Sequence, residues 1–259
     1  MLKSIRGIFA LLSISFLLLP LLAILPLAFT SGAMLNYPIP AVSMRWFDAI
    51  FQDEVWRRAI TNSLWIGLGT TLLSTVLGGS AALALRNRLP FAGTLKTIFL
   101  LPMVVPAVVL GVGMQLTFVQ LHIANSFIGV IIAHTLIAVP FVLICTSSAL
   151  NAIDRRIEFA AYSLHGTPWV VFWRITLPLA MPGVVSGAVL AFATSLDEVV
   201  LTTFVAGPEQ RTLSRQMFSM VRDNISPAVA AAAFMFIGGT VLVAGLVLLL
   251  RRNRTAVAA

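Results

Sequence analysis

The sequence predicts an all-α integral membrane protein with six transmembrane helices and both termini in the cytoplasm. Of its 259 residues, 59% are hydrophobic and only 10% are charged, and the mean hydropathy is +1.00. Soluble domains are nearer to half apolar and a quarter charged, so a water-soluble globular enzyme is excluded. The other two observations are a set of long uncharged segments and an uneven distribution of Lys and Arg along the chain.

The uncharged segments give the number of spans. Five stretches contain no Asp, Glu, Lys or Arg: residues 7–44, 59–85, 97–153, 175–196 and 224–250. About 20 apolar residues cross the hydrocarbon core of a bilayer as a helix. The second and fifth stretches hold 27 residues each and fit one crossing, whereas the third holds 57 and fits two. His122, Asn125 and Ser126 mark the expected turn between those two crossings.

The first and fourth uncharged stretches each give one further span, for a total of six. Ser31-Gly32 and the prolines that follow shorten the first to a span near residues 8–30. A cleaved signal peptide is the alternative for this span, although its apolar stretch exceeds the ~7–15 residues of a signal core. The fourth stretch is expected to continue through Asp197 and Glu198 to about Ala206, as one span with two acids inside it.

The basic residues orient the six spans. With the N-terminus inside, the cytoplasmic segments hold 11 Lys and Arg residues and the opposite side holds 6. The cytoplasmic set consists of Lys3, Arg6, Arg86, Arg88, Lys96, Arg155, Arg156, Arg174, Arg251, Arg252 and Arg254. Cytoplasmic loops of membrane proteins carry the excess of Lys and Arg. The net charge of +8 is therefore assigned to membrane orientation and not to binding of nucleic acid.

The residue types within the spans indicate close packing of helices and give no sign of a metal site or a catalytic site. Glycines that would let helices approach closely occur in the second and sixth spans: Gly67, Gly69, Gly78, Gly79, Gly238 and Gly239. The single cysteine, Cys145, excludes an internal disulfide. No cluster of His, Cys, Asp or Glu has the spacing of metal ligands, and no nucleophile–base arrangement is visible. We expect no metal, no cofactor and no catalytic residue.

The longest cytoplasmic loop, residues 151–174, is predicted to contain an amphipathic helix. Its apolar residues recur at helical spacing and form one stripe: Ile153, Ile157, Ala160, Ala161 and Leu164. Asp154 is a candidate N-cap, and Gly166 and Pro168 supply a stop signal. Periodicity alone leaves two interpretations, a helix lying on the bilayer surface and a helix that docks onto a partner.

Residues 157–178 resemble the cytoplasmic "EAA" loop of ABC-importer permeases. That pattern is Glu-Ala-Ala, three residues, Gly, nine residues, then Ile-x-Leu-Pro, and five residues fall on it: Ala160, Ala161, Ile175, Leu177 and Pro178. Phe159 stands at the Glu position with Glu158 just before it, and His165 stands at the Gly position with Gly166 just after it.

The resemblance implies that this loop couples the chain to an ATPase. The residues implied in that contact are Glu158, Phe159, Ala160, Ala161, His165 and Gly166. Phe159 falls outside the apolar stripe, where an aromatic ring either contacts water or fills a pocket on a partner. We expect Phe159 to pack into the ATPase and to replace a polar anchor by burial.

The resemblance extends over most of the chain from about Arg45 onward, and it is to the second permease subunit of spermidine/putrescine importers. It rests on residues 45–47, 101–102, 195–200, 204–208 and 226–227. It implies the transmembrane fold of a type I ABC importer in a bacterial inner membrane and a small, cationic solute such as a polyamine. The implied partners are a second permease subunit, a cytoplasmic ATPase dimer, an extracytoplasmic solute-binding protein and membrane lipid.

The chain itself is not expected to be an enzyme. It has no Gly-x-x-x-x-Gly-Lys-Ser/Thr run, so ATP hydrolysis by that route belongs to another polypeptide. The alternative function is a secondary transporter or channel that needs no ATPase, but such a protein would have no use for a docking loop. The expected organisation is a first helix and extracytoplasmic loop over 1–57, a transmembrane core over 58–250 with the coupling loop 151–174, and a cytoplasmic tail over 251–259.

Three ionisable residues inside the spans are candidates for the translocation path. A charge at mid-bilayer costs at least about 2.5 kcal/mol, so acids there face a cavity or a partner. Asp197 and Glu198 point about 100° apart on a helix, so one is expected to face the path and the other to bond to a neighbouring helix or to the partner permease. The alternative for both acids is a structural hydrogen-bond acceptor near the outer interface. For His134 the two alternatives are a path residue and a satisfied contact between helices.

Overall fold

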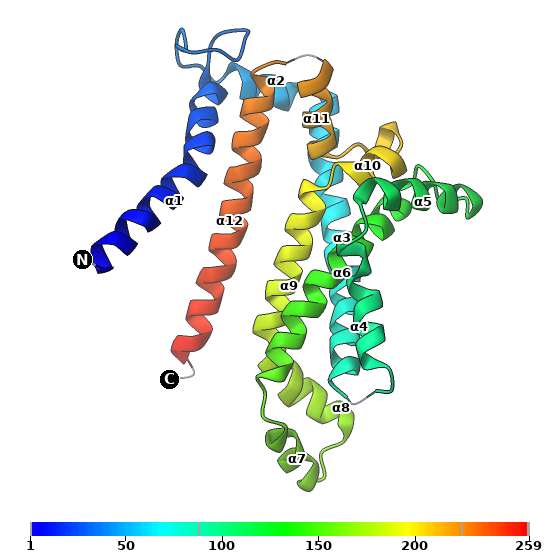
Figure 1. Ribbon diagram of the computed structural model, residues 1–259. Coiled ribbons are helices and arrows are strands. Elements are labelled where there is room, and N and C mark those ends of the chain that lie inside the picture. Colours follow the sequence, from blue (N-terminus) through cyan, green and yellow to red (C-terminus); the bar gives the residue numbers. More distant parts are fainter. Residues whose placement is uncertain (1, 88, 224, 258–259) are drawn as a thin grey trace. The chain divides into compact units, whose positions relative to one another are not determined.

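The computed structural model describes residues 2–87, 89–223 and 225–257, except for the side chains of residues 2–5, 243–244 and 246–257. The basic residues Lys3, Arg88, Arg251, Arg252 and Arg254 lie outside the described side chains. Helices account for nearly all regular structure in the described residues (Figure 1), and the β pairing there is the isolated bridge between Thr30 and Val42. The all-α prediction is confirmed.

The chain forms two compact units. One unit comprises residues 1–57 and 216–259, and the other comprises residues 58–215. The first unit contains α1 (Leu2–Ile24), the 3₁₀ turn η1 (Leu25–Phe29), α2 (Arg45–Gln52) and α12 (Ala228–Val257). Its aromatic core is made by Phe29, Phe47 and Phe234, whose ring centroids lie 5.1–5.8 Å apart. These three rings join η1, α2 and α12.

The second unit is built on three long helices, α3 (Glu54–Arg86, which begins in the first unit), α6 (Phe127–Asn151) and α9 (Leu177–Asp197). The remaining elements of this unit are α4 (Ala92–Leu100), η2 (Leu101–Met103), α5 (Ala107–Gln120), α7 (Arg155–Ser163), α8 (Pro168–Val171), the π-helical turn η3 (Phe172–Thr176), α10 (Val200–Val205) and the 3₁₀ turn η4 (Pro208–Gln210). Helix α11 (Leu213–Asp223) runs from this unit into the other.

Helix α6 lies at the centre of the second unit because small residues let its neighbours approach. A Cβ added to Gly183 of α9 would lie 2.4 Å from Ala149 Cβ of α6, and a Cβ added to Gly78 of α3 would lie 2.8 Å from Val142 Cβ. Gly67 and Gly69 are equally crowded, as the sequence predicted. For Gly79, Gly238 and Gly239 close packing stays a prediction, since no described atom lies within 4 Å of an added Cβ.

The number of spans is confirmed only in part. Four segments are long and apolar enough to cross a membrane: Arg6–Phe29, Glu54–Arg86, Phe127–Asn151 and Pro168–Asp197. A fifth is the bent pair Ala92–Met103 and Ala107–Gln120, and the apolar part of α12 that can be assessed, Ala228–Leu242, is shorter than a full crossing. The sixth span stays a prediction. The turn expected at residues 122–126 is confirmed, since Ser126 caps α6 and accepts the N–H of Gly129 at 3.0 Å.

The third predicted span is not a straight helix. Its two halves meet at an angle of 97°. Pro102 and Pro106 flank the bend, and since proline has no N–H to donate, the helical hydrogen bonds cannot continue through it. Helix α5 consequently leaves the direction of α4 (Figure 1).

The fifth predicted span ends earlier than the sequence suggested. The prediction of one helix through Ala206 is wrong, because α9 ends at Asp197 and a new helix, α10, begins at Val200. The backbone of Glu198 is extended, with φ −76° and ψ 111°. Its carboxylate accepts the N–H of Leu201 at 2.7 Å, which satisfies a donor of the first turn of α10. The two acids therefore lie at a break between helices.

Candidate functional site

Helix α7 and the residues around it form the first candidate site, which Figure 1 shows beyond the ends of α6 and α9. The predicted amphipathic helix is confirmed and runs from Arg155 to Ser163. The Asp154 carboxylate caps it by accepting the N–H of Arg156 at 2.9 Å. At the other end, the N–H of His165 donates to Tyr162 O and that of Gly166 to Ala161 O, both at 3.0 Å. These two bonds are the Schellman arrangement that closes a helix.

His165 occupies the position in this helix end that glycine usually takes. Its φ is +61°, in the left-handed region that costs a residue with a Cβ roughly 1–2 kcal/mol. The departure from the family pattern at His165 is therefore a change of residue and not a shift of the turn. Gly166, one position later, is needed for space, since an added Cβ would lie 2.7 Å from Ala161 O.

The inner face of α7 is fixed by a buried ion pair. Glu158 Oε1 lies 2.6 Å from Arg86 Nη1 at the end of α3, and the two side chains are only 15% and 7% exposed. The same carboxylate oxygen accepts the hydroxyl of Thr176 at 2.6 Å. Arg86 also donates to Ile153 O at 3.1 Å, and its own carbonyl accepts from Arg155. Through Glu158, α7 is connected to α3 and to the π-helical turn that precedes α9.

Neither Arg86 nor Thr176 was predicted as a site residue. A signal was present for Arg86, because Arg86, Arg88 and Lys96 are the only charged residues between positions 59 and 153. A glutamate on the inner face of a loop helix needs a cation when it is buried, and those three residues are the cations that the segment 59–153 offers to the loop. The role of Thr176 had no comparable signal.

Helix α7 carries exposed apolar side chains alongside exposed polar ones such as Arg156 and Ser163. Phe159 is 62% exposed and Leu164 is 83% exposed. Of the predicted stripe, Ile157, Ala160 and Leu164 face outward, whereas Ile153 and Ala161 are partly buried. The stripe is thus divided between the inside and the outside of the protein. An exposed apolar surface of this kind marks a contact with another protein or with a membrane.

A second candidate site is the polar junction of α6, α9 and α10. His134 is fully buried, and its Nδ1 and Nε2 lie 2.8 Å and 2.9 Å from the hydroxyls of Ser195 and Thr202. The Thr202 hydroxyl donates its one proton to Glu198 O at 2.9 Å. Nε2 must then be the donor to Thr202, and Nδ1 accepts from Ser195. Both ring nitrogens are satisfied within the protein, which favours the interpretation of His134 as a contact between helices.

The two acids at this junction have different surroundings. Glu198 is partly buried and caps α10. Asp197, the last residue of α9, is exposed, and its carboxylate makes no hydrogen bond or ion pair with the described residues. The arrangement leaves one carboxylate occupied and the other available at the helix break. Among the described residues, no group of three or more His, Cys, Asp or Glu could hold a metal ion.

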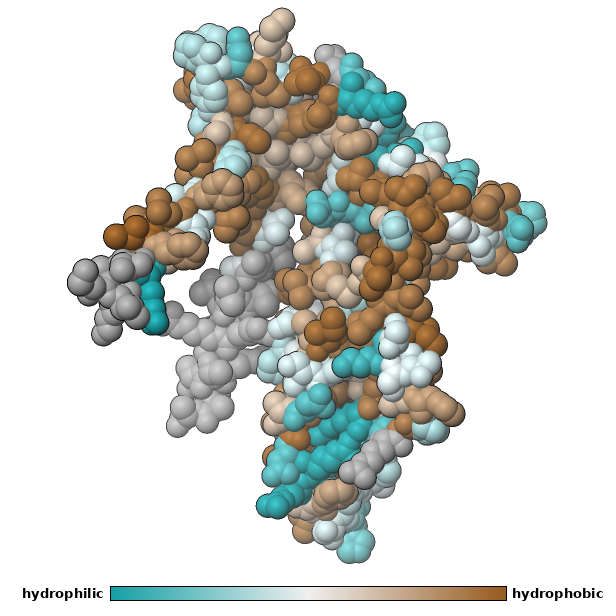
Figure 2. Space-filling model, in the orientation of Figure 1, coloured by the Kyte–Doolittle hydropathy of each residue, from teal (hydrophilic) through white to brown (hydrophobic). Residues whose placement is uncertain are grey.

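Residues 74–255 match the family described as binding-protein-dependent transport system inner membrane component. The chain belongs to this family. It is therefore a multi-pass membrane protein and the permease component of a binding-protein-dependent ABC importer. The exposed apolar side chains over α4 and α5, brown in Figure 2, suit such a location, and those of α5 include Val108, Val109, Val112, Leu116 and Val119.

Relatives of the permease carry different solutes. It is 33% identical to the putrescine transport system permease protein PotI of Escherichia coli, over 92% of this chain and 87% of the relative. It is 32% identical to the spermidine/putrescine transport system permease protein PotC of Haemophilus influenzae, over 82% and 83%. It is also 32% identical to the molybdenum transport system permease protein ModB of Mycobacterium bovis, over 80% and 86%.

Solved structures agree in fold. A chain of a bacterial ABC transporter involved in import of the acidic polysaccharide alginate superposes with a TM-score of 0.72 at 14% identity, covering 95% of both chains. A chain of the bacterial alginate transporter in complex with a pentasaccharide-bound periplasmic protein gives 0.68 at 18% identity, covering 93% of the permease and 90% of that chain.

Proposed function

We propose that the permease forms the translocation path for a small cationic solute of the polyamine class. Its similarity to PotI and PotC supports this class, although the molybdenum permease is similar to nearly the same degree. The observation that favours a cation is Asp197, a carboxylate without a protein partner among the described residues, at a break in a membrane helix. Acids at membrane depth usually face a cavity or a partner, and a carboxylate there attracts a cation.

We propose that α7 is the docking element for a cytoplasmic ATPase dimer. Its exposed apolar residues, with Phe159 at their centre, would enter the ATPase, and its buried acid, Glu158, would carry the movement into the membrane. The ion pair of Glu158 with Arg86 and its hydrogen bond with Thr176 connect α7 to α3 and to the start of α9. ATP hydrolysis takes place on the ATPase chains. The remaining partners are a second permease subunit and an extracytoplasmic solute-binding protein.

The proposed topology has six spans, with both termini in the cytoplasm of a bacterial inner membrane. The Lys and Arg residues support this orientation with 11 on the cytoplasmic side and 6 on the other. The rings of Trp169 and Trp173, 69% and 50% exposed, follow α7 directly, as expected for aromatic side chains at a membrane interface. The proposed organisation keeps the first helix and loop at 1–57, the core at 58–250 and the tail at 251–259.

Exchange of the two acids for amides tests the cation path. The complete importer, reconstituted in vesicles, would be assayed for uptake of radiolabelled putrescine and for ATP hydrolysis without solute. We expect Asp197→Asn to reduce uptake by about tenfold, as loss of roughly 1.4 kcal/mol of attraction would, and to leave basal hydrolysis intact.

The companion variant Glu198→Gln removes a charge from the adjacent residue, and Asp48→Asn removes one from α2, far from the break in sequence. Glu198→Gln keeps a side-chain oxygen that can cap α10, so its uptake should fall less than that of Asp197→Asn. Asp48→Asn should transport at the normal rate. Normal uptake by both Asp197→Asn and Glu198→Gln would reject the path role and leave the two acids as structural acceptors.

A further inference from the structure

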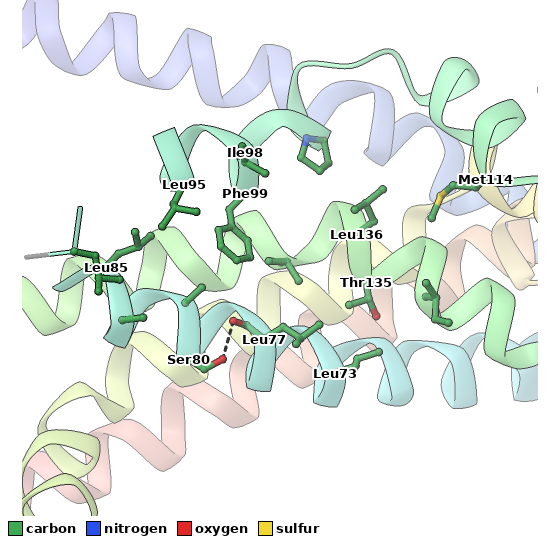
Figure 3. Close-up of a pocket in the computed structure, with 16 residues that line it drawn as sticks. Leu73, Leu77, Ser80, Leu85, Leu95, Ile98, Phe99, Met114, Thr135 and Leu136 are labelled. Atoms are coloured by element: carbon green, nitrogen blue, oxygen red, sulfur yellow. Dashed lines mark hydrogen bonds between the residues drawn. The ribbon is translucent and has the colours of Figure 1, made fainter. Parts of the chain in front are cut away.

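A cavity of about 780 Å³ lies in the second unit between α3, α4 and α6. Figure 3 shows side chains from these helices pointing toward a common space, among them Leu77, Leu85, Leu95, Phe99 and Leu136. Met114 of α5 lies at one end and Leu85 at the other. Neither the proposed solute path nor the docking helix uses this space.

The polar atoms in the lining are already occupied. Ser80 donates its hydroxyl to Val76 O at 2.6 Å and to Leu77 O at 3.0 Å, the second of which is the dashed line in Figure 3. The Thr135 hydroxyl donates to Ile131 O at 2.7 Å. The other lining residues are apolar. The lining offers a ligand almost no free hydrogen-bond donor or acceptor, so the ligand must itself be apolar.

The length of the cavity matches that of a lipid acyl chain. The lining of α3 runs from Leu73 to Leu85, which is about 18 Å along a helix axis. One leaflet of the hydrocarbon core is about 15 Å deep, so the cavity has the length of one lipid leaflet.

The charges at one end of the cavity suit a lipid headgroup. Arg86, Arg88 and Lys96 are the only charged residues between positions 59 and 153, and all of them are basic. Of the two whose side chains are described, Arg86 ends α3 and Lys96 lies in α4, and Leu89 of the intervening loop and Leu95, beside Lys96, line the cavity. Arg86 is held by Glu158, whereas Lys96 is exposed. A long Lys side chain can extend along apolar surface to reach a phosphate at the interface.

We propose that the cavity binds one acyl chain of an anionic phospholipid, with its phosphate near Lys96. This inference rests on the proposed function only in the choice of leaflet, which is the cytoplasmic one. The bound chain would fill the space between α4 and the α3–α6 pair and so fix α4 against the core of the permease.

Photolabelling of the assembled importer tests this site. The probes are phosphatidylglycerol and phosphatidylcholine, each with a diazirine near the end of one acyl chain, in nanodiscs of the complex. We expect phosphatidylglycerol to label peptides of α3, α4 and α6 that line the cavity. Ala84→Phe, at an exposed lining position, should reduce this labelling by about tenfold. Val76→Phe, exposed on the same helix but outside the lining, should leave it unchanged.

A second pair of measurements addresses the headgroup and the integrity of the variants. Lys96→Gln should lower labelling by phosphatidylglycerol to the level of phosphatidylcholine. If Ala84→Phe fails to assemble, Leu89→Trp fills the cavity mouth from the exposed loop instead and should give the same loss.

Absence of label from the cavity peptides would overturn the proposal. Cross-links from a photoreactive residue at position 99 to the second permease subunit would overturn it as well, since a protein helix would then occupy the space. Photolabelling of the cavity needs neither solute nor ATP. The labelling result would therefore still test the lipid site if the putrescine uptake assay failed.

Discussion

At the scale of single residues, Glu158 is the side chain that links α7 to α3 and to the turn that precedes α9. It is an acid with one cation, Arg86, and one hydroxyl, Thr176, within 2.6 Å. Removing one member of a buried pair leaves the other charge uncompensated, which costs roughly 3–5 kcal/mol, whereas replacing both by apolar residues is often neutral. This asymmetry makes the pair testable without reference to transport.

We expect Arg86→Met and Glu158→Leu each to lower the stability of the purified permease complex strongly, and the double variant to recover most of the loss. Thermal unfolding monitored by fluorescence would measure the three effects. The exposed pair Arg58–Glu209, with side chains 44% and 69% exposed, is the matched control and should change stability by less than about 1 kcal/mol. Additive losses in the 86/158 double variant would show that the two residues act independently.

Phe159 is an exposed aromatic residue of α7, and we propose that it binds the ATPase. Truncation of an aromatic anchor at an interface commonly costs about 2 kcal/mol, or roughly thirtyfold in affinity. We expect Phe159→Ala to reduce recovery of the ATPase in a pull-down with the permease, at unchanged permease abundance. Phe218→Ala, which removes a 55% exposed ring from α11, provides the control. Undiminished recovery with Phe159→Ala would mean that the ring rests on lipid headgroups.

At the scale of elements, the end of α7 depends on a residue poorly suited to its conformation. Since His165 adopts a φ of +61° and glycine adopts such angles without a Cβ penalty, His165→Gly should stabilise the end of α7 by up to about 1 kcal/mol. Hydrogen exchange of the amides of residues 162–166 should slow accordingly. Gly166→Ala, which would place a Cβ 2.7 Å from Ala161 O, should speed exchange in the same segment. Faster exchange in His165→Gly would indicate that the imidazole contributes a contact of its own.

Elements whose apolar pattern is long and uninterrupted could be predicted, and those decided by a local contact could not. The charge gaps located α1, α3 and α6 to within about six residues, and Asp154 marked the start of α7. The end of α9 was missed because the side chain of Glu198 caps α10, and hydropathy does not register a cap. The division of the α7 stripe was missed because the pairing of Glu158 with Arg86, 72 residues away in sequence, turns the acid inward.

At the scale of the whole molecule, the sequence predicts the orientation of the spans across the membrane. The fold is compatible with either orientation, so an experiment must measure it. With six spans and the N-terminus inside, Asp48 lies outside and Arg254 inside. A cysteine at position 48 (Asp48→Cys) should react with an impermeant maleimide in intact cells, and one at position 254 (Arg254→Cys) only after permeabilisation. The native Cys145 is replaced by alanine in both variants, which removes background labelling. The reverse pattern of labelling would require the opposite orientation.

The early end of α9 also has an electrostatic consequence that comes from the backbone and not from a side chain. The aligned peptide dipoles of a helix leave about half a negative charge at its C-terminus, and α9 ends at Asp197. The positive N-terminus of α10 is already paired with the carboxylate of Glu198. It therefore gives the negative C-terminus of α9 no compensating charge. The backbone and Asp197 together make this point attractive to a cation. Conversion of Asp197 to an amide removes only the side-chain part, and uptake should therefore fall without disappearing.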